Sequence, residues 1–170
     1  MLAEKKAPLT RSQMMARVRS ADTKPELVLR KALHATGYRF RLHVRSLPGR
    51  PDIVMRKHRC AIFVNGCFWH GHTGCKHFRV PKTRTEFWAT KIECNRKRDR
   101  RAIEALLDDG WRVLVIWECA TRSFQTDNLI SDIAAWLQGP ETSAEMLSEG
   151  LSIDGRMRSV ISSGELGTGR

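Results

Sequence analysis

Apolar and polar residues recur along the chain at spacings that predict helices and strands. Leu29 and Leu33 are four residues apart, which places them on one face of a helix, and Gly37 is a typical residue to end it. Thr23 and Glu26 have the spacing of a capping box, in which two side chains pair with backbone amides of the first turn. The pattern therefore predicts a helix from about Thr23 to Gly37.

Further stretches predict strands. Residues 38–44 alternate apolar with basic side chains, which is the period of a strand with one buried and one basic face. Residues 53–55 and 60–64 are short apolar runs joined by a polar turn, which predicts a hairpin. Residues 111–117 are almost continuously apolar, as expected for a central strand covered on both faces.

Two more helices complete the pattern. Residues 83–109 carry apolar side chains at helical spacing, begin with a second possible capping box, and precede Gly110. A last helix is predicted to begin at Thr126 or Asp127 and to stop at Gly139. The order helix, three strands, helix, strand, helix predicts an α/β/α sandwich with a mixed central sheet.

The chain of 170 residues has room for one folded domain, which we expect at residues 23–138. Residues 1–22 form a basic arm, which is either a solvated tail or an arm that contacts DNA with Met15 as an apolar tip. Residues 139–170 show no sustained period and are predicted to be a loosely ordered or disordered tail.

Net charge and cysteine content narrow the range of possible partners and cell compartments. The net charge of +12 indicates a polyanionic partner, most often nucleic acid, although a basic protein that is merely soluble or ribosome-associated is an alternative. We recognise no secretory signal and no apolar run of the ~20 residues that span a bilayer. We therefore expect a protein of the reducing cytoplasm, where clustered Cys and His are metal ligands before they are disulfides.

One short loop has the spacing of a metal site. Cys67, His72 and Cys75 are arranged as Cys-x₄-His-x₂-Cys, which allows one loop to wrap a tetrahedral ion. Cys119, at the end of the last predicted strand, could supply a fourth ligand. Such a Cys₃His set suits Zn²⁺, and a site closed by four protein ligands is typically structural.

Two residues near this loop are candidates for catalysis. Asp52 follows a proline at the mouth of the predicted hairpin, where a metal-dependent nuclease needs an anionic ligand for Mg²⁺, although many Pro-Asp pairs are simple turns. His70, which the zinc loop would hold near Asp52, is a candidate general base that activates water.

Other residues are candidates for DNA contact. Phe68 and Trp69 either cover the zinc site from water or wedge between base pairs, and Met15 could do the latter from the basic arm. Lys91, Asn95 and Asp99 share one face of the long helix, where Lys91 and Asn95 could meet the bases.

Five segments resemble the very short patch repair (Vsr) mismatch endonucleases: TRSQMMARV, LPGRPDIV, IFVNGCFWHGHTGC, PKTRTEFWATKI and GWRVLVIWEC. The resemblance runs in order from about Thr10 to Trp136. It implies a restriction-endonuclease-like α/β/α domain that uses Mg²⁺ for catalysis and Zn²⁺ for structure. It also implies that the protein nicks one DNA strand 5′ of the T in T:G mismatches, which arise by deamination of 5-methylcytosine.

The resemblance extends to individual residues. It implies that Asp52 is the Mg²⁺-binding catalytic aspartate, that His70 is the catalytic histidine and that Glu26 is an acidic residue of the same site. Val64 would contribute its backbone carbonyl to the Mg²⁺. The implied zinc ligands are Cys67, His72, Cys75 and Cys119, and the implied DNA contacts are Met15, Phe68, Trp69, Trp88, Lys91 and Asn95.

Two positions depart from the family pattern. Asn65 stands where some relatives carry a second active-site histidine, and Val64 stands where some have a hydroxyl residue. A backbone ligand survives the second change, whereas Asn65 cannot exchange a proton as histidine does. Catalysis would then depend more heavily on His70.

The expected partner is double-stranded DNA with a T:G mismatch, with repair proteins as further candidates. We expect a monomer that acts in the cytoplasm at the nucleoid and does not bind membranes. One alternative is a nuclease of the same fold that cuts paired DNA on both strands. The other is a zinc module that binds DNA without cleaving it.

Overall fold

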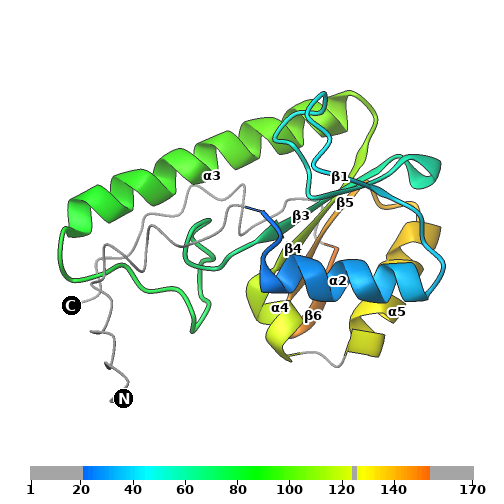
Figure 1. Cartoon of the computed structure of the whole chain (residues 1–170). Helices are drawn as coiled ribbons and strands as arrows, with labels where there is room; N and C mark the ends of the chain where they lie inside the picture. Colours follow the sequence, from blue (N-terminus) through cyan, green and yellow to red (C-terminus); the bar gives the residue numbers. More distant parts are fainter. Residues whose placement is uncertain (1–20, 124–125, 154–170) are drawn as a thin grey trace, which may run out of the picture.

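The computed structural model describes residues 21–123 and 126–153, so the predictions for Met15 and for residues 154–170 lie outside it. Within these ranges the chain forms one mixed sheet with helices on both faces (Figure 1). The strands are β1 Arg41–Leu42, β2 Ile53–Met55, β3 Cys60–Asn65, β4 Arg112–Trp117, β5 Ser143–Leu147 and β6 Gly150–Ser152. This arrangement confirms the predicted α/β/α sandwich.

The order of the strands in the sheet is the order in which they follow along the chain. The predicted hairpin is confirmed, because β2 runs antiparallel to β3 with Ile53 opposite Ile62. Strands β3, β4 and β5 are parallel, and β6 returns antiparallel to β5 at the far edge. The predicted central strand is therefore β4, which lies between two parallel neighbours.

The helices divide between the two faces of the sheet. The long helix α3 covers one face, and the other three lie on the opposite face (Figure 1). Their bounds are α2 Lys24–Ala35, α3 Thr85–Asp108, α4 Glu118–Ser123 and α5 Thr126–Gln138, with a short 3₁₀ turn η1 at Arg56–His58. None of the helices in the described ranges is long and apolar enough to cross a membrane.

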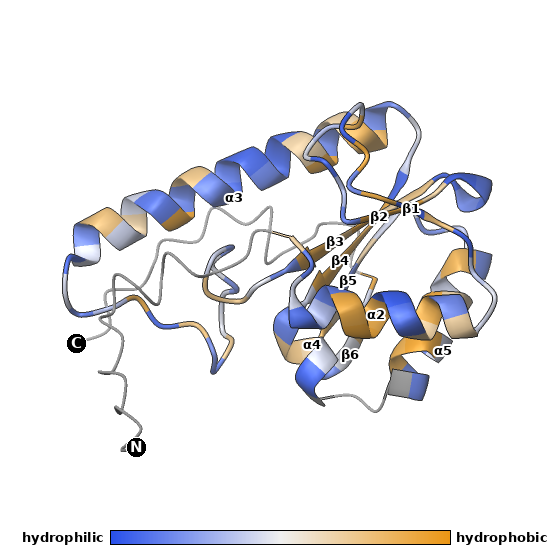
Figure 2. Ribbon diagram, in the orientation of Figure 1, coloured by the Kyte–Doolittle hydropathy of each residue, from blue (hydrophilic) through white to orange (hydrophobic). Residues whose placement is uncertain are grey.

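Alternate residues of β4 belong to two separate cores. Leu114 and Ile116 pack toward α2 and α5, whereas Val113 and Val115 pack toward α3. All four side chains are completely buried, which agrees with a strand covered on both faces. Figure 2 shows the consequence along the helices, because α3 is polar through much of its length and apolar where it meets the sheet.

The two predicted capping boxes have different outcomes. At α2 the box is confirmed, because Glu26 Oε1 accepts hydrogen bonds from the Thr23 hydroxyl at 2.8 Å and from the Thr23 amide at 3.3 Å. Helix α3 instead has Arg84 at its cap position, in the left-handed conformation with φ +55°. The predicted box at Thr83 is therefore wrong, although the helix ends before Gly110 as predicted.

The predicted strand at residues 38–44 is wrong except at Arg41–Leu42. His43 has a φ of +47°, a left-handed conformation that interrupts the alternation of faces. As a result Leu42 is 43% exposed, whereas the ring of His43 turns toward the interior. Tertiary surroundings, which a local pattern does not contain, decide this conformation.

The prediction of a loosely ordered tail from residue 139 is wrong for residues 143–152. Strand β5 pairs along β4, and its Ala144 and Met146 are buried in the core shared with α2 and α5. The folded domain therefore continues past residue 138. Pairing with a central strand stabilises this segment, although its own sequence has little apolar periodicity.

The sheet brings the predicted catalytic segments to one edge, which is formed by the carboxyl ends of the parallel strands and not by an outer strand. Strand β3 ends at Asn65 and the parallel strand β4 ends at Trp117, so their carboxyl ends lie side by side. Because β2 is antiparallel to β3, Asp52, which precedes β2, lies at the same edge. Ligands of open α/β sheets typically bind at this edge.

Candidate active site and metal centre

The four predicted zinc ligands come together beside this edge. Their ligand atoms all lie within 4.8 Å of one another, and we call the group of Cys67, His72, Cys75 and Cys119 the Cys₃His cluster. His72 Nδ1 is 3.6 Å from Cys67 Sγ and 3.5 Å from Cys119 Sγ. Usual Zn–S and Zn–N bond lengths at a tetrahedral angle give a nitrogen–sulfur separation of about 3.6 Å. The residues therefore fit a metal ion such as Zn²⁺.

Hydrogen bonds within this cluster favour the ionised form of one thiol. A hydrogen bond from the Cys67 thiol lowers the pKa of Cys119 to about 4, and His72 adds to this effect. The same hydrogen bond raises the pKa of Cys67, because Cys67 keeps the proton that the two sulfurs share. Since thiolates are the metal-binding form of cysteine, Cys119 already presents the form that a zinc ion takes.

Neighbouring residues hold the loop of the Cys₃His cluster against the sheet and α3. The ring of His72 stacks on Trp117 of β4, with centroids 4.1 Å apart and planes 9° from parallel. Gly71 has a φ of +66°, and a Cβ at this residue would lie 2.6 Å from Ile92 Cγ2 of α3, so the close approach requires glycine. The Asn95 side-chain nitrogen donates to the Trp69 carbonyl at 2.8 Å. Asn95 thus fixes this loop, and its predicted contact with bases stays a prediction.

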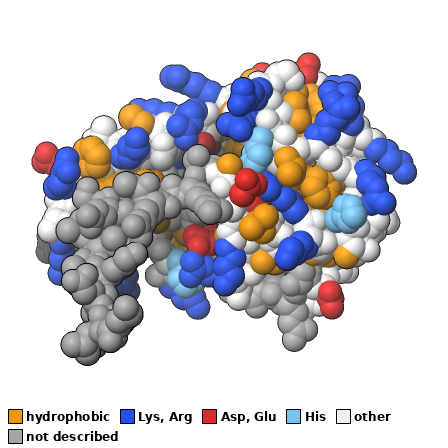
Figure 3. All heavy atoms as spheres, viewed as in Figure 1, with side chains coloured by type: hydrophobic (Ala, Val, Ile, Leu, Met, Phe, Trp, Pro, Cys, Tyr) orange, Lys and Arg blue, Asp and Glu red, His pale blue; other side chains and the backbone are white. Residues whose placement is uncertain are grey.

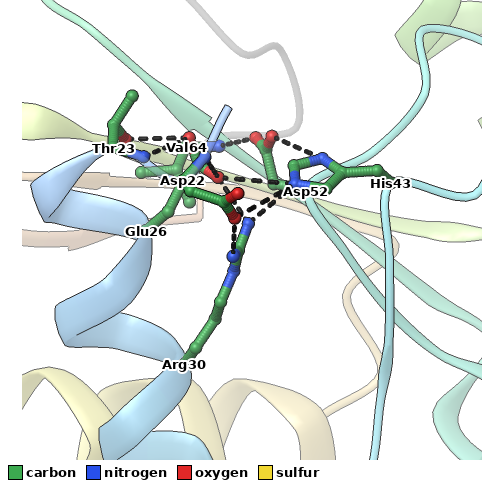
Figure 4. A network of polar contacts seen from close by, with 7 residues as sticks. All are labelled: Asp22, Thr23, Glu26, Arg30, His43, Asp52 and Val64. Atoms are coloured by element: carbon green, nitrogen blue, oxygen red, sulfur yellow. Dashed lines mark hydrogen bonds and ion pairs between the residues drawn. The ribbon is translucent and has the colours of Figure 1, made fainter. Parts of the chain in front are cut away.

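A second group of polar residues surrounds Asp52 (Figure 4). Asp52 Oδ2 accepts a hydrogen bond from the Val64 amide at 2.8 Å, and Oδ1 lies 3.6 Å from His43 Nδ1. The pKa of Asp52 is raised to about 6, mainly because the group is buried; the hydrogen bond from the Val64 amide opposes this shift, and the carboxylate of Glu26 adds to it. A buried carboxylate of this kind gains a partner when a cation binds.

Glu26 is buried in this group and is already engaged by other residues. Its Oε2 accepts from Arg30 Nη2 at 2.5 Å and from the Asp22 amide at 3.1 Å. Arg30 Nη1 donates to Asp22 Oδ1 at 2.5 Å, which holds the pKa of that carboxyl below its usual value. We call Asp22, Glu26, Arg30, His43 and Asp52 the carboxylate cluster.

Three residues of the carboxylate cluster also have the composition of a metal site. Ligand atoms of Asp22, Glu26 and His43 lie within 4.8 Å of one another. The guanidinium of Arg30 contacts all three side chains, however, and its positive charge offsets one of the two negative charges of the carboxylates. This group therefore keeps its geometry without an ion between its members.

His70 is oriented by a partner from α3. Its Nδ1 lies 2.5 Å from Asp99 Oδ2, so the carboxylate holds the ring and directs Nε2 away from α3. The four-residue spacing predicts that Asp99 lies on the same helix face as Lys91 and Asn95, but it does not predict the contact with His70. The helical spacing indicates that face, whereas the partner across the loop is a tertiary contact that the spacing does not reveal.

A cavity of about 940 Å³ connects the predicted catalytic residues, and its walls include Glu26, Asp52, Val64, Asn65 and His70. Asn65 is 5% exposed and is one of the residues that line the cavity. Arginines 45, 50 and 98 also line it and supply positive charge. Figure 3 shows Lys and Arg side chains spread over the described part of this face, around a smaller group of acidic and histidine side chains.

The predicted aromatic DNA contacts form one cluster beside the Cys₃His loop. Phe68, Trp69 and Trp88 pack edge to face, with ring centroids between 5.2 and 6.0 Å apart. Phe87 extends the cluster and is 47% exposed, and Lys91 is exposed on the same helix. These rings lie near the surface, and Trp69 also lines the cavity.

A carboxylate at the mouth of a hairpin, at the edge of a mixed sheet between helical layers, defines the class of restriction-endonuclease-like nucleases. The family model for DNA mismatch endonuclease Vsr matches residues 3–77. DNA mismatch endonuclease Vsr of Escherichia coli (strain K12) is 45% identical over 147 residues, which cover 85% of this chain and 94% of that protein. The chain therefore belongs to the Vsr family and is a DNA endonuclease.

Other relatives carry the name of nicking enzymes. Type II nicking enzyme V.XorIIP of Xanthomonas oryzae is 50% identical over 118 residues, which cover 69% of this chain and 86% of that protein. Type II nicking enzyme V.NaeI of Lentzea aerocolonigenes is 37% identical over 146 residues, which cover 82% of this chain and 87% of that protein. The similarity thus extends over most of the folded domain.

Proposed function

We propose that this endonuclease nicks one strand of double-stranded DNA 5′ of the T in a T:G mismatch and so begins very short patch repair. The observation that carries the proposal is the shared cavity of Asp52 and His70, which belong to different segments of the chain. Membership of the Vsr family supports the choice of a mismatch as substrate. We further propose that the protein acts as a monomer in the cytoplasm, at the nucleoid.

The carboxylate of Asp52 and the backbone carbonyl of Val64 would hold Mg²⁺. The donor set fits, because Mg²⁺ prefers oxygen ligands and Asp52 offers a buried carboxylate at the wall of the cavity. When bound, the ion would offset the negative charge on the phosphate and on the departing 3′ oxygen.

His70 is the proposed general base. Its Nδ1 is taken by Asp99, so Nε2 accepts a proton from the attacking water. The water oxygen forms a bond to phosphorus while the bond from phosphorus to the 3′ oxygen breaks. Asn65 can orient water or phosphate by hydrogen bonds but cannot take up the proton, which leaves this step to His70.

The remaining predicted residues act on structure and on DNA. Glu26 is the further acidic residue that we propose for the catalytic site, and it holds Arg30 and so shapes the site from α2. Zinc in the Cys₃His cluster would hold the loop that carries His70. The proposed DNA contacts are the wedge of Met15, Phe68 and Trp69, together with Trp88, Lys91 and Asn95.

A nicking assay tests this function. In Mg²⁺, we expect the protein to cut only the T strand of a labelled T:G duplex, and to leave the fully paired duplex intact. Replacement of Asp52 by Ala should reduce the rate by about 10³-fold or more, since it removes a proposed ligand of the catalytic ion. Asp108→Ala, at an exposed residue of α3, is the matched control and should cut at the normal rate.

Other outcomes would favour the alternatives. Cleavage of both strands of paired DNA would indicate a same-fold endonuclease with another substrate. DNA binding without cleavage in Mg²⁺ or Mn²⁺ would indicate a zinc module that only binds DNA. Because several relatives are named type II nicking enzymes, the assay should also vary the bases that flank the mismatch.

A further inference from the structure

His43 occupies an unusual position beside the proposed catalytic carboxylate. Its φ of +47° is uncommon for a residue other than glycine, and it ends β1 and turns the ring inward. The His43 amide also donates to the Asp52 carbonyl at 3.4 Å, so backbone and side chain both approach Asp52. A backbone conformation of this kind persists where surrounding contacts determine it.

The contacts of the ring fix the location of its proton. Arg30 Nη2 lies 2.9 Å from His43 Nε2 (Figure 4). A guanidinium has only donors, so Nε2 must accept and the proton of the neutral ring lies on Nδ1. That proton then faces Asp52 Oδ1, from which Nδ1 is 3.6 Å away.

We propose that His43 is a positioning residue for Asp52, with Arg30 fixing the tautomer that presents the Nδ1–H to the carboxylate. This inference rests on the proposed role of Asp52 in holding Mg²⁺. One oxygen of Asp52 is already fixed by the Val64 amide, and the hydrogen bond from His43 would fix the other. Both oxygens would then keep their remaining lone pairs in one orientation for the ion.

The distance of 3.6 Å is a few tenths of an ångström longer than a hydrogen bond. Such contacts are often long before the reacting complex forms and shorten within it. Partners that orient a metal ligand typically change metal affinity or activity by about 10–100-fold when they are removed. We therefore expect substitution of His43 to change the Mg²⁺ concentration that nicking requires.

His43 also lines the same cavity as Asn65, which stands where some relatives carry a second active-site histidine. Strand β3, which carries Asn65, holds Asp52 Oδ2 through the Val64 amide. His43 approaches Oδ1, the other oxygen, from the end of β1. The site thus has a second histidine besides His70, supplied by the residue after β1 and used to orient Asp52 rather than to transfer a proton.

Two substitutions separate the two ring nitrogens. In His43→Asn the side-chain nitrogen can take the place of Nδ1 and keep a donor toward Asp52. In His43→Gln the longer side chain reaches the place of Nε2 and keeps only the contact with Arg30. His34→Gln, at an exposed residue of α2, is the matched control.

We would measure Mn²⁺ binding by the loss of the free-ion paramagnetic resonance signal, and the Mg²⁺ concentration that gives half-maximal nicking. His43→Gln should raise both by about 10–100-fold, with the nicking rate recovering at saturating Mg²⁺. His43→Asn should restore both toward wild type, and His34→Gln should change neither. Wild-type metal dependence in His43→Gln, or an equal loss in His43→Asn, would overturn the proposal.

A measurement on the unaltered protein keeps the test independent of folding in the variants. Nitrogen-15 chemical shifts of the His43 ring should show a protonated Nδ1 and a bare Nε2, and a proton on Nε2 would overturn the proposal. If wild type fails to nick mismatched DNA, the proposed function fails, while the tautomer and Mn²⁺ binding still report on His43. If wild type nicks and His43→Gln behaves like it, only the positioning role fails.

Discussion

The Cys₃His cluster and the carboxylate cluster adjoin the same edge of the sheet, and they are built in opposite ways. Three of the four Cys₃His residues come from residues 67–75, and only Cys119 comes from elsewhere. The carboxylate cluster draws on α2, on the end of β1 and on the residue before β2. One cluster is thus nearly local, whereas the other exists only in the folded sheet.

The two clusters also differ in how their charge is balanced. Arg30 supplies a cation inside the carboxylate cluster, which therefore keeps its geometry by itself. In the Cys₃His cluster, Cys119 presents a thiolate whose partners are another thiol and a histidine. We therefore expect the local cluster to depend on a bound metal for its stability, and we expect the dispersed cluster to keep its shape through Arg30, with Asp52 at its margin as the proposed ligand of a second ion.

Loss of a ligand from the proposed zinc site should have the largest effect on stability. Cys119→Ser, or a strong chelator, is expected to lower Tm by more than about 10 °C, because metal binding to such a site contributes many kcal/mol to folding. The matched control is Cys94→Ser, which replaces an exposed cysteine of α3 and should leave Tm unchanged. Thermal unfolding followed by circular dichroism measures both Tm values. An unchanged Tm for Cys119→Ser would show that the Cys₃His cluster does not depend on a metal for its stability.

Asp52→Asn should act in the opposite direction and stabilise the metal-free protein. The pKa of Asp52 is raised to about 6, so ionisation above that pH opposes folding, whereas below its ordinary value near 3.8 it has no effect. At pH 8 the variant should be more stable than wild type by up to about 3 kcal/mol, and at pH 5 by about half as much.

Urea unfolding without added Mg²⁺ at the two pH values measures this difference. Asp108→Asn, at an exposed residue, should show no such dependence on pH. A variant less stable than wild type at pH 8 would mean that Asp52 contributes to the geometry of its cluster, contrary to the comparison.

The smallest expected effect concerns the contact between the loop of the Cys₃His cluster and α3. Asn95→Ala removes the hydrogen bond to the Trp69 carbonyl and should cost about 1 kcal/mol, which is about 2–4 °C in Tm. Lys91→Ala, one turn away on the exposed surface, should weaken DNA binding in a filter or fluorescence assay without changing Tm. The opposite pattern would show that Asn95 acts mainly on DNA.

Much of the fold was predictable because it depends on local patterns. The capping box of α2, the hairpin of β2 and β3, and the apolar run of β4 all follow from spacing within a few residues. The Cys₃His cluster was predictable for the same reason, since three of its members lie in one short loop. Their confirmation shows that local periodicity and ligand spacing are sufficient where neighbours in sequence are neighbours in space.

Other features depend on distant contacts and escaped prediction. Strand β5 is only five residues long and contains a buried Glu145, so its place beside β4 was not visible in its own pattern. His43 was assigned to a basic strand face, because the alternation did not reveal its left-handed backbone. Asp99 was noted on its helix face, but its contact with His70 joins residues far apart in the chain.

The strands lie in the sheet in the same order as in the chain, and this has a consequence for synthesis of the protein. Each strand pairs with the strand made just before it, so the sheet can grow at one edge as the chain leaves the ribosome. Cys119 follows β4, and therefore the four-ligand metal site cannot close before the central strand has been translated. Metal capture would then mark the point in translation at which the central strand is complete.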